Sequence, residues 1–239
     1  MTIGRPEVPD YQAISRRLVL IHEAADEEQT LDSIIAFALS SLECDMGGVM
    51  LTSGGQLETA GATQPLVEQA DQLQMSLAEG PCLSALRAQQ NFRIDDTRTD
   101  PRWPRWGPAA AELGIRSVLS IRMADLDKPT IGSVNLYARR TGAFGPDSLE
   151  LAAILGRHAT TAYLKARRHS AAKRAIDTRG TIGQAQGILM ERFDIDADRA
   201  FSILRRYSQA ENVPLRRVAG DLVASRQLPQ TTLTCDKAS

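Results

Sequence analysis

The sequence predicts an α+β domain, with an antiparallel sheet flanked by helices, that one long helix joins to an all-α domain of three helices. Three observations indicate this fold. As far as Ala138, segments with helical spacing of apolar residues alternate with strand-like segments rich in Val, Ile and Leu. From Pro146 a helical pattern runs for roughly 46 residues, to Phe193. Two short amphipathic segments follow.

The elements of the first domain follow from the period of the apolar residues. Helices are expected where apolar residues recur every three or four positions or where proline marks a helix start, over residues 11–25, 30–42, 65–77 and 81–90. Strands are expected where the pattern changes and turn residues flank it, over residues 49–51, 57–60, 91–95, 117–123 and 131–138. Gly54 and Gly55 predict a tight hairpin turn, residues 126–129 a second turn, and residues 96–108 a long loop.

The long helix begins with a capping pattern, Asp147 at the cap and Glu150 three residues later. Small and apolar residues then recur at alternating spacings of three and four, the period of a coiled-coil seam. This seam is formed by Ala152, Leu155, Ala159, Ala162, Ala166, His169, Lys173, Ile176, Gly180, Gly183, Gly187 and Met190. Such a seam predicts a parallel homodimer. In the alternative, its first half packs on the chain's own sheet.

The C-terminal part is predicted to be a small helical bundle. One helix, to about Glu211, has an apolar side made of Ala200, Phe201, Ile203, Leu204 and Tyr207. The next has an apolar side made of Leu215, Val218, Ala219, Leu222 and Val223. We expect a first domain over residues 11–166, a second over 167–226, and a disordered tail over 227–239 because its apolar content is low.

The charges are distributed unevenly along the chain. Up to Leu164 there are 14 basic and 21 acidic residues, and after it 14 basic and 8 acidic, so the formal charges are −7 and +6. A basic C-terminal part indicates an anionic partner, although solvated helix faces would give the same count.

Several functional classes are not supported by the sequence. There is no apolar leader, and no apolar run approaches the roughly 18 residues of a membrane span. The cysteines, Cys44, Cys82 and Cys235, are odd in number and far apart, which is typical of a reducing, cytoplasmic setting. No metal-ligand spacing, nucleophile elbow or phosphate loop is present, so we expect neither a metal, a cofactor nor an enzyme.

The segment from Ala171 to Val223 resembles the ANTAR domain, an RNA-binding antiterminator module. The residues that carry this resemblance are Arg179, Ile182, Ala185, Gly187, Leu189, Met190, Ala200, Phe201, Leu204, Ser208, Asn212, Leu215 and Ala219. The resemblance implies binding to stem loops in messenger leaders, which prevents a terminator from forming. One departure is Gln186, which stands where the family usually has lysine; it removes a charge that would contact phosphate.

The region from Tyr11 to Ala166 resembles a GAF domain of the type fused to ANTAR modules. The motifs are EGPC at 79–82, DTRTDPRWP at 96–104, GIRSVLSIRM at 114–123, IGSVNLYA at 131–138 and GAFG at 142–145. The resemblance implies a sensor with a cavity for a small ligand, such as a nucleotide or metabolite. Cys82 is a candidate ligand-binding residue because a helix N-terminus lowers a thiol pKa; the alternative is a small buried hydrophobe. Trp103 and Trp106 would line or close a pocket, or else pack at an edge.

The candidate RNA-binding surface lies on the long helix. Arg179, Gly183, Gln186 and Met190 share one face, and a second face, made of Ile182, Ala185, Leu189 and Phe193, would be core. Each glycine inside a helix costs about 1 kcal/mol relative to alanine, so several indicate a close approach, either of RNA or of a neighbouring helix. The predicted contacts are completed by Gly187 and by arginines suited to phosphate, Arg192, Arg205, Arg206, Arg216 and Arg217.

The leading hypothesis is a cytoplasmic RNA-binding regulator of transcription antitermination, controlled by ligand or signal sensing in the first domain. The alternative is a DNA- or protein-binding regulator that uses the same helices. A phosphorylated receiver domain, suggested by Asp95 and Asp96, is disfavoured by the glycine-turn hairpin. Reduction of free methionine sulfoxide, an activity of some GAF domains, is disfavoured because only Cys44 and Cys82 lie in this domain.

Overall fold

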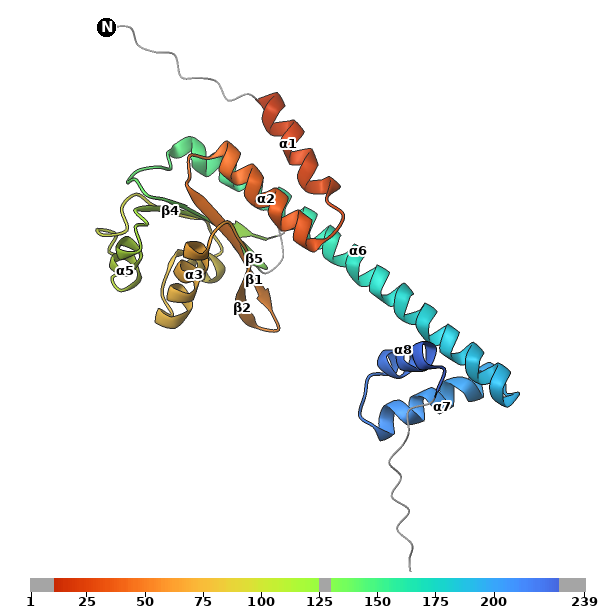
Figure 1. The fold of residues 1–239 in the computed structure, drawn as a ribbon. Helices are drawn as coiled ribbons and strands as arrows, with labels where there is room; N and C mark the ends of the chain where they lie inside the picture. The colour runs from red at the N-terminus through yellow and green to blue at the C-terminus, as the bar shows by residue number, and fades with distance from the viewer. Residues whose placement is uncertain (1–10, 125–129, 228–239) are drawn as a thin grey trace, which may run out of the picture. The chain divides into compact units, whose positions relative to one another are not determined.

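The computed structural model describes residues 11–124 and 130–227 (Figure 1). The turn expected at 126–129, and the tail expected at 227–239 apart from Gln227, lie outside these residues. The chain divides into two compact units, Met1–Arg168 and His169–Ser239. Each unit is described by itself.

The first unit is built on a five-stranded antiparallel sheet with the order β2-β1-β5-β4-β3. Its strands are β1 (Met46–Ser53), β2 (Gln56–Ala62), β3 (Phe92–Ile94), β4 (Ser117–Met123) and β5 (Gly132–Ala138). The hairpin between β1 and β2 turns at Gly54 and Gly55, whose φ angles of 58° and 83° favour glycine. The α+β class and the antiparallel sheet predicted from the sequence are confirmed.

Helices cover the sheet on both faces. They are α1 (Tyr11–Glu23), α2 (Glu27–Ser41), α3 (Pro65–Leu77), α4 (Pro81–Ala88), α5 (Trp106–Glu112) and the first part of α6 (Pro146–Phe193). Successive strand residues point to opposite faces. Leu119 and Leu136 therefore join the core that includes α2 and α6, whereas Val118 and Tyr137 join the core that includes α3 and α5.

Three helix starts differ from the sequence prediction. Helix α2 begins at Glu27 because the Asp26 carboxylate accepts a hydrogen bond from the Gln29 amide at 2.9 Å. Helix α5 occupies the end of the expected loop; its proline lies in the first turn, where the missing N–H costs nothing. Helix α6 begins at Pro146, so Asp147 lies inside the first turn rather than at the cap.

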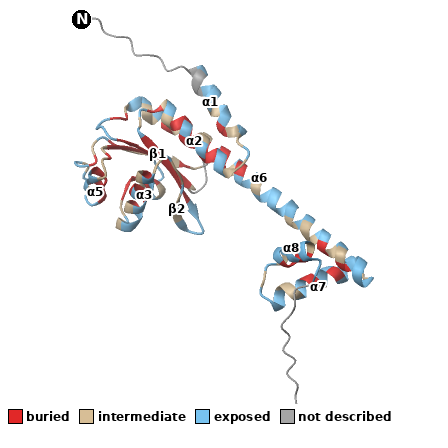
Figure 2. Ribbon diagram, in the orientation of Figure 1, coloured by how far each residue is buried: buried red, intermediate tan, exposed pale blue. Residues whose placement is uncertain are grey.

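The second unit consists of the last part of α6, α7 (Ala197–Ala210) and α8 (Leu215–Ser225). The fully covered side chains that join the three helices are Ala185, Leu189, Ala200, Leu204, Val218, Ala219 and Leu222. Two aromatic residues that the sequence assigned to apolar sides are instead exposed: Phe193 by 50% and Phe201 by 37%. A bundle this small covers a narrow stripe of each helix, and these rings lie outside it (Figure 2).

The predicted seam of α6 divides in the same way. Ala152, Leu155, Ala159 and Ala162 are buried in the first unit's own core, which supports the alternative interpretation of the first half. Ile176, on the later half, is 68% exposed. Among the described residues, no helix has the length and apolar content needed to cross a membrane.

Candidate functional site

The candidate face of α6 is an open helical surface. Arg179, Gly183, Gln186 and Met190 follow one another at spacings of four, three and four residues, so they share one side. Arg179 and Gly183 are exposed, and Met190 is 37% exposed. A Cβ atom placed on Gly183 or Gly187 would meet no atom within 4 Å. Packing inside the chain therefore does not require these glycines.

Buried residues of α6 hold this face in place. Ala185 and Leu189 are fully buried against α7 and α8. Asp196 caps α7 by accepting a hydrogen bond from the Arg199 amide at 2.7 Å, which sets where that helix starts. The face is thus presented by a fixed three-helix support.

Gln186 is tied to the start of α7. Its Nε2 atom donates to the carbonyl oxygen of Ala197 at 3.0 Å. An amide in the place of the family's lysine is therefore used, at least in part, to join two helices. Its contribution to a ligand differs from that of a free cation.

The candidate arginines lie on all three helices and are exposed. Arg192 is on α6, Arg205 and Arg206 are on α7, and Arg216 is on α8. Arg192 and Gly187 meet in a hollow of about 750 Å³ between α6 and α8; Arg226, which the sequence did not single out, also lines it. Arg226 ends α8 in a left-handed conformation with φ 57°, a position that its helical pattern alone does not mark.

In the first unit, the EGPC motif has a structural role at two helix starts. One Oε1 atom of Glu79 accepts hydrogen bonds from the amides of Arg105 and Trp106, at 2.8 and 2.9 Å, at the start of α5. Gly80 has φ 149°, and a Cβ there would lie 2.4 Å from Oε1 of Gln74. That same oxygen accepts from the Cys82 amide at 2.9 Å, at the start of α4.

The Cys82 thiol is buried rather than reactive. Its Sγ atom lies 2.8 Å from the Ser133 hydroxyl. Burial raises its pKa to about 12, against the lowering expected from a helix N-terminus. The structure supports the alternative of a small buried residue.

The two candidate tryptophans are part of the core. Trp103 and Trp106 are buried in the cluster that includes α3 and α5. The indole nitrogen of Trp103 donates to the Ser84 hydroxyl at 3.0 Å, and that of Trp106 to the Ala70 carbonyl at 3.4 Å. They anchor the segment between β3 and β4 rather than lining an open surface.

A buried polar network, which the sequence did not reveal, lies between α3 and the sheet. One Asp71 oxygen accepts from the Tyr137 hydroxyl at 2.9 Å and from the Asn135 amide at 3.4 Å, and the other from the Thr59 hydroxyl at 2.9 Å. Burial raises the pKa of Asp71 to about 6, against the opposing effect of these hydrogen bonds. This is the strongest perturbation of a carboxyl group among the described residues.

The network extends to Cys82 through the central strands. Asn135 Oδ1 accepts from the Ser120 and Ser133 hydroxyls at 2.8 and 3.1 Å, and Ser133 contacts the thiol. The signal in the sequence is the alternation of Ser133, Asn135 and Tyr137, which places three polar groups on one face of a strand rich in apolar residues.

Two family models account for these two units. One, described as a GAF domain, matches residues 24–162, and the other, described as an ANTAR domain, matches residues 170–223. The chain belongs to the GAF–ANTAR family. ANTAR is an RNA-binding antitermination domain, and GAF is a signal-sensing domain whose members bind small ligands. The architecture is that of a regulator.

Solved structures share the GAF fold at low sequence identity. The free methionine-R-sulfoxide reductase of Neisseria meningitidis has 14% identity and a TM-score of 0.53, covering 70% of this chain and 99% of that one. The reduced enzyme of Staphylococcus aureus has 14% identity and a TM-score of 0.52, covering 67% and 99%. The GAF domain of an Acinetobacter phosphoenolpyruvate-protein phosphotransferase has 9% identity and a TM-score of 0.53, covering 68% and 98%. These likenesses show the fold alone. No curated protein matches this chain in sequence.

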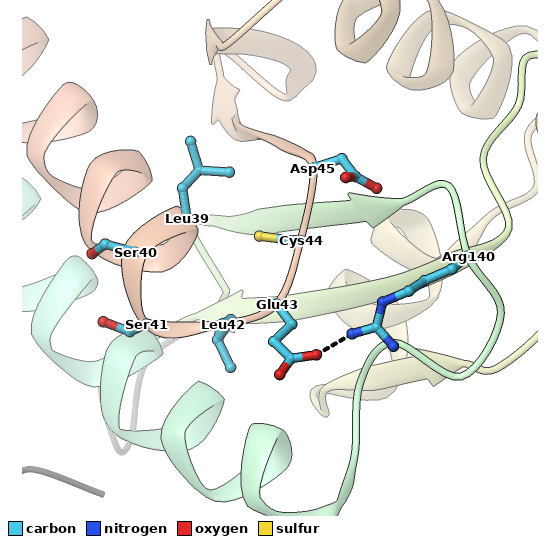
Figure 3. A pocket seen from close by; sticks show the side chains of 8 residues that line it. All are labelled: Leu39, Ser40, Ser41, Leu42, Glu43, Cys44, Asp45 and Arg140. Carbon is cyan, nitrogen blue, oxygen red and sulfur yellow. Dashed lines mark hydrogen bonds and ion pairs between the residues drawn. The ribbon is translucent and has the colours of Figure 1, made fainter.

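The GAF domain also has a hollow of about 460 Å³ at the end of α2 (Figure 3). Cys44, Asp45 and Arg140 line it, and Arg140 forms an ion pair with Glu43 across it. Burial raises the pKa of Cys44 to about 12, so this thiol is not activated either. Within residues 11–124 and 130–227, no group of three or more His, Cys, Asp or Glu side chains is placed to hold a metal ion.

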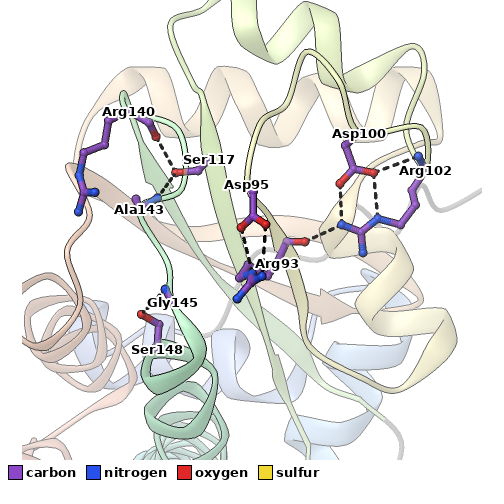
Figure 4. Close-up of polar contacts among 9 residues, drawn as sticks. All are labelled: Arg93, Asp95, Asp100, Arg102, Ser117, Arg140, Ala143, Gly145 and Ser148. Atoms are coloured by element: carbon purple, nitrogen blue, oxygen red, sulfur yellow. Dashed lines mark hydrogen bonds and ion pairs between the residues drawn. The ribbon is translucent and has the colours of Figure 1, made fainter.

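Ion pairs organise the aspartates of the GAF domain's β3–α5 segment. Arg102 binds Asp100 and its guanidinium lies 4.5 Å from the centre of the Trp103 ring, and Arg93 binds Asp95 (Figure 4). Asp96, the other residue of the receiver-like pair, accepts two hydrogen bonds from one Arg116 nitrogen, which lowers its pKa. These aspartates are bound to arginines and hold a loop.

Proposed function

We propose that this GAF–ANTAR protein is a cytoplasmic regulator that acts by transcription antitermination. Its ANTAR domain binds stem loops in nascent transcripts, and its GAF domain controls that binding in response to a ligand or signal. The observation that carries the proposal is the open face of Arg179, Gly183, Gln186 and Met190, whose glycines contact nothing within the chain.

The charge of the ANTAR part supports an anionic partner. The chain after Leu164 has 14 basic and 8 acidic residues, and its candidate arginines are exposed on all three helices. Phosphates contacted by such cations release counterions, so binding weakens as salt rises. A glycine surface between these cations lets a backbone approach α6 closely.

A homodimer through the outer half of α6 is part of the proposal. Ile176 continues the spacing of the glycine face and is 68% exposed. An apolar side chain of this size on an open helix is suited to a second copy of the same helix. Two ANTAR domains in one dimer would bind two stem loops with a high effective concentration for the second contact.

We also propose that the GAF domain is a sensor without catalytic activity. Reduction of methionine sulfoxide would require an accessible thiolate, whereas burial raises the pKa of both Cys44 and Cys82 to about 12. The buried network around Asp71 is the most perturbed polar site of this domain, and a signal that changed its hydrogen bonds would act on α3 and the central strands together.

The experiment compares labelled stem-loop RNA, drawn from a pool with randomised loops, with duplex DNA of equal length. We expect the full chain to bind selected stem loops at least about tenfold more tightly than the duplex, with a steep loss of affinity as salt rises. Gly183→Leu should remove most RNA binding because it fills the open face.

Gly220→Leu is the matched control. Gly220 also lies in a helix of the ANTAR domain, and a Cβ there would meet no atom within 4 Å. RNA affinity should be retained in this variant, and circular dichroism should show equal helix content in both. Equal binding of stem loops and duplex DNA by the wild type would refute the proposal and favour a DNA-binding regulator.

A further inference from the structure

Three large apolar side chains of the ANTAR domain are exposed. Phe193 is 50% exposed, and Met190 and Phe201 are each 37% exposed. The core beneath them is complete without them, since small and aliphatic residues fill it. These three side chains therefore do not contribute a fully covered surface to the fold, and two of them present aromatic rings to the outside.

The contacts of Gln186 place these side chains on one surface. In an α-helix the carbonyl of Ala197 faces the amide of residue 201, so the Gln186 side chain that reaches this carbonyl lies beside the backbone of Phe201. Met190 and Phe193 follow Gln186 on α6 by four and seven residues and share its side. The result is an aromatic row, defined as Phe201, Gln186, Met190 and Phe193.

The charges around the aromatic row differ from one end to the other. Arg205 lies one turn beyond Phe201 on the same side of α7, and Arg179 lies two turns before Gln186 on α6. Near Phe193, by contrast, the chain carries Asp194 and Asp198. Cations at one end attract phosphates, whereas carboxylates at the other disfavour them and accept hydrogen bonds from base amino groups.

We propose that the aromatic row stacks with unpaired bases of the RNA loop, while Arg179 and Arg205 contact the phosphates of the adjoining stem. This inference rests on the proposed RNA binding and names the part of the RNA that this surface recognises. Unpaired loop bases are the usual target of sequence-specific RNA recognition, and aromatic side chains are their stacking partners. A double-stranded stem keeps its bases stacked on one another and offers this row nothing.

The experiment uses the full chain and a stem loop selected from a pool with randomised loops, with 2-aminopurine placed at successive loop positions. Phe193→Ala and Phe201→Ala should each weaken binding of this RNA by roughly 5- to 150-fold, the range expected from losing one stacked base. Binding to a blunt duplex RNA, and the salt dependence, should stay as in the wild type. The 2-aminopurine emission quenched by the wild type should recover in the variants.

Two further substitutions separate stacking from apolar burial. Phe193→Trp keeps a π-face and should retain loop binding, whereas Phe193→Leu keeps apolar volume and should lose it. Ile176→Ala is the control, because Ile176 is the most exposed of the large apolar residues reported for α6 and lies outside the row. Its loop affinity should match the wild type at protein concentrations where both are dimers.

Each other outcome overturns the inference. If leucine restores binding as well as tryptophan does, or if the Phe variants change the oligomeric state and not the loop affinity, the row is an apolar contact between copies of the chain. Equal loss of loop RNA and duplex RNA would make it a general support of the helix. Failure of the proposed function itself is distinct, since the wild type would then select no stem loop.

Discussion

The two halves of α6 have the same residue types at the same spacing but opposite surroundings. In the GAF half, Ala152, Leu155 and Ala159 are buried, and a Cβ on Gly156 would lie 2.6 Å from the Arg122 carbonyl oxygen. In the ANTAR half, a Cβ on Gly183 would meet nothing within 4 Å. A seam period identifies which residues share a side of a helix, but it does not identify what covers that side.

The difference indicates what the glycines do in each half. Gly156 lets α6 lie directly against β4, so its small size supports the fold. The later glycines each cost about 1 kcal/mol of helix stability relative to alanine and gain no contact in return within the chain. Their benefit has to come from a partner, which we propose to be RNA and a second copy of the helix.

The largest expected difference between the halves comes from removing one apolar side chain in each. Leu155→Ala should lower the free energy of unfolding of the GAF domain by about 2 to 5 kcal/mol, because it leaves a cavity in a close-packed core. Ile176→Ala should change that quantity by less than about 0.5 kcal/mol. Urea unfolding followed by tryptophan fluorescence measures the GAF domain alone, because both tryptophans lie in it.

The same pair tests the proposed dimer. Sedimentation velocity should show that Ile176→Ala raises the concentration at which dimers form, whereas Leu155→Ala leaves it unchanged in protein that is still folded. A loss of GAF stability in Ile176→Ala equal to that in Leu155→Ala would remove the distinction between the halves. It would place the outer half of the seam in the GAF core.

The next effect is smaller and has opposite signs in the two halves. Gly156→Ala should destabilise the GAF domain by about 1 to 3 kcal/mol, because the backbone carbonyl of Arg122 cannot move aside as a flexible side chain would. Gly183→Ala should stabilise the ANTAR helix by up to about 1 kcal/mol, because alanine restricts the unfolded chain and meets open space. Thermal unfolding by circular dichroism, at a concentration that keeps the chain monomeric, measures both. Destabilisation by Gly183→Ala would show a hidden contact at that glycine.

The sequence was sufficient for the elements with a strong period. The long helix was expected to run for about 46 residues and spans 48, because its alternating spacing continues through the glycines. Helix α5 was missed because it has only seven residues, with glycine and proline in its first turn. Length and composition at that position both resemble those of a loop.

The parts of the sites that the sequence missed depend on contacts between distant segments. Asp71 lies in α3, and its partners come from β2 and β5, so no local spacing links them. Opposition of Ser120 and Asn135 follows from the register of β4 on β5, which depends on the whole sheet. Phe193 and Phe201 have the apolar character of core residues, and only the width of the bundle shows that they are left uncovered.

The smallest expected effect concerns Gln186, the residue that joins the open face of α6 to α7. Gln186→Lys places a cation beside the aromatic row while keeping a donor that can reach the Ala197 carbonyl. If an added phosphate contact forms, the slope of log affinity against log salt should become steeper by about 0.7 to 0.9. Affinity for the selected stem loop should rise a few-fold at low salt and converge with the wild type at high salt. Gln186→Met, which has similar length and neither charge nor donor, is the control for loss of the bond to Ala197. A gain in Gln186→Lys that is independent of salt would mean that the position acts through the packing of α7 and Phe201, and that the outer half of α6 meets bases rather than phosphate at this point.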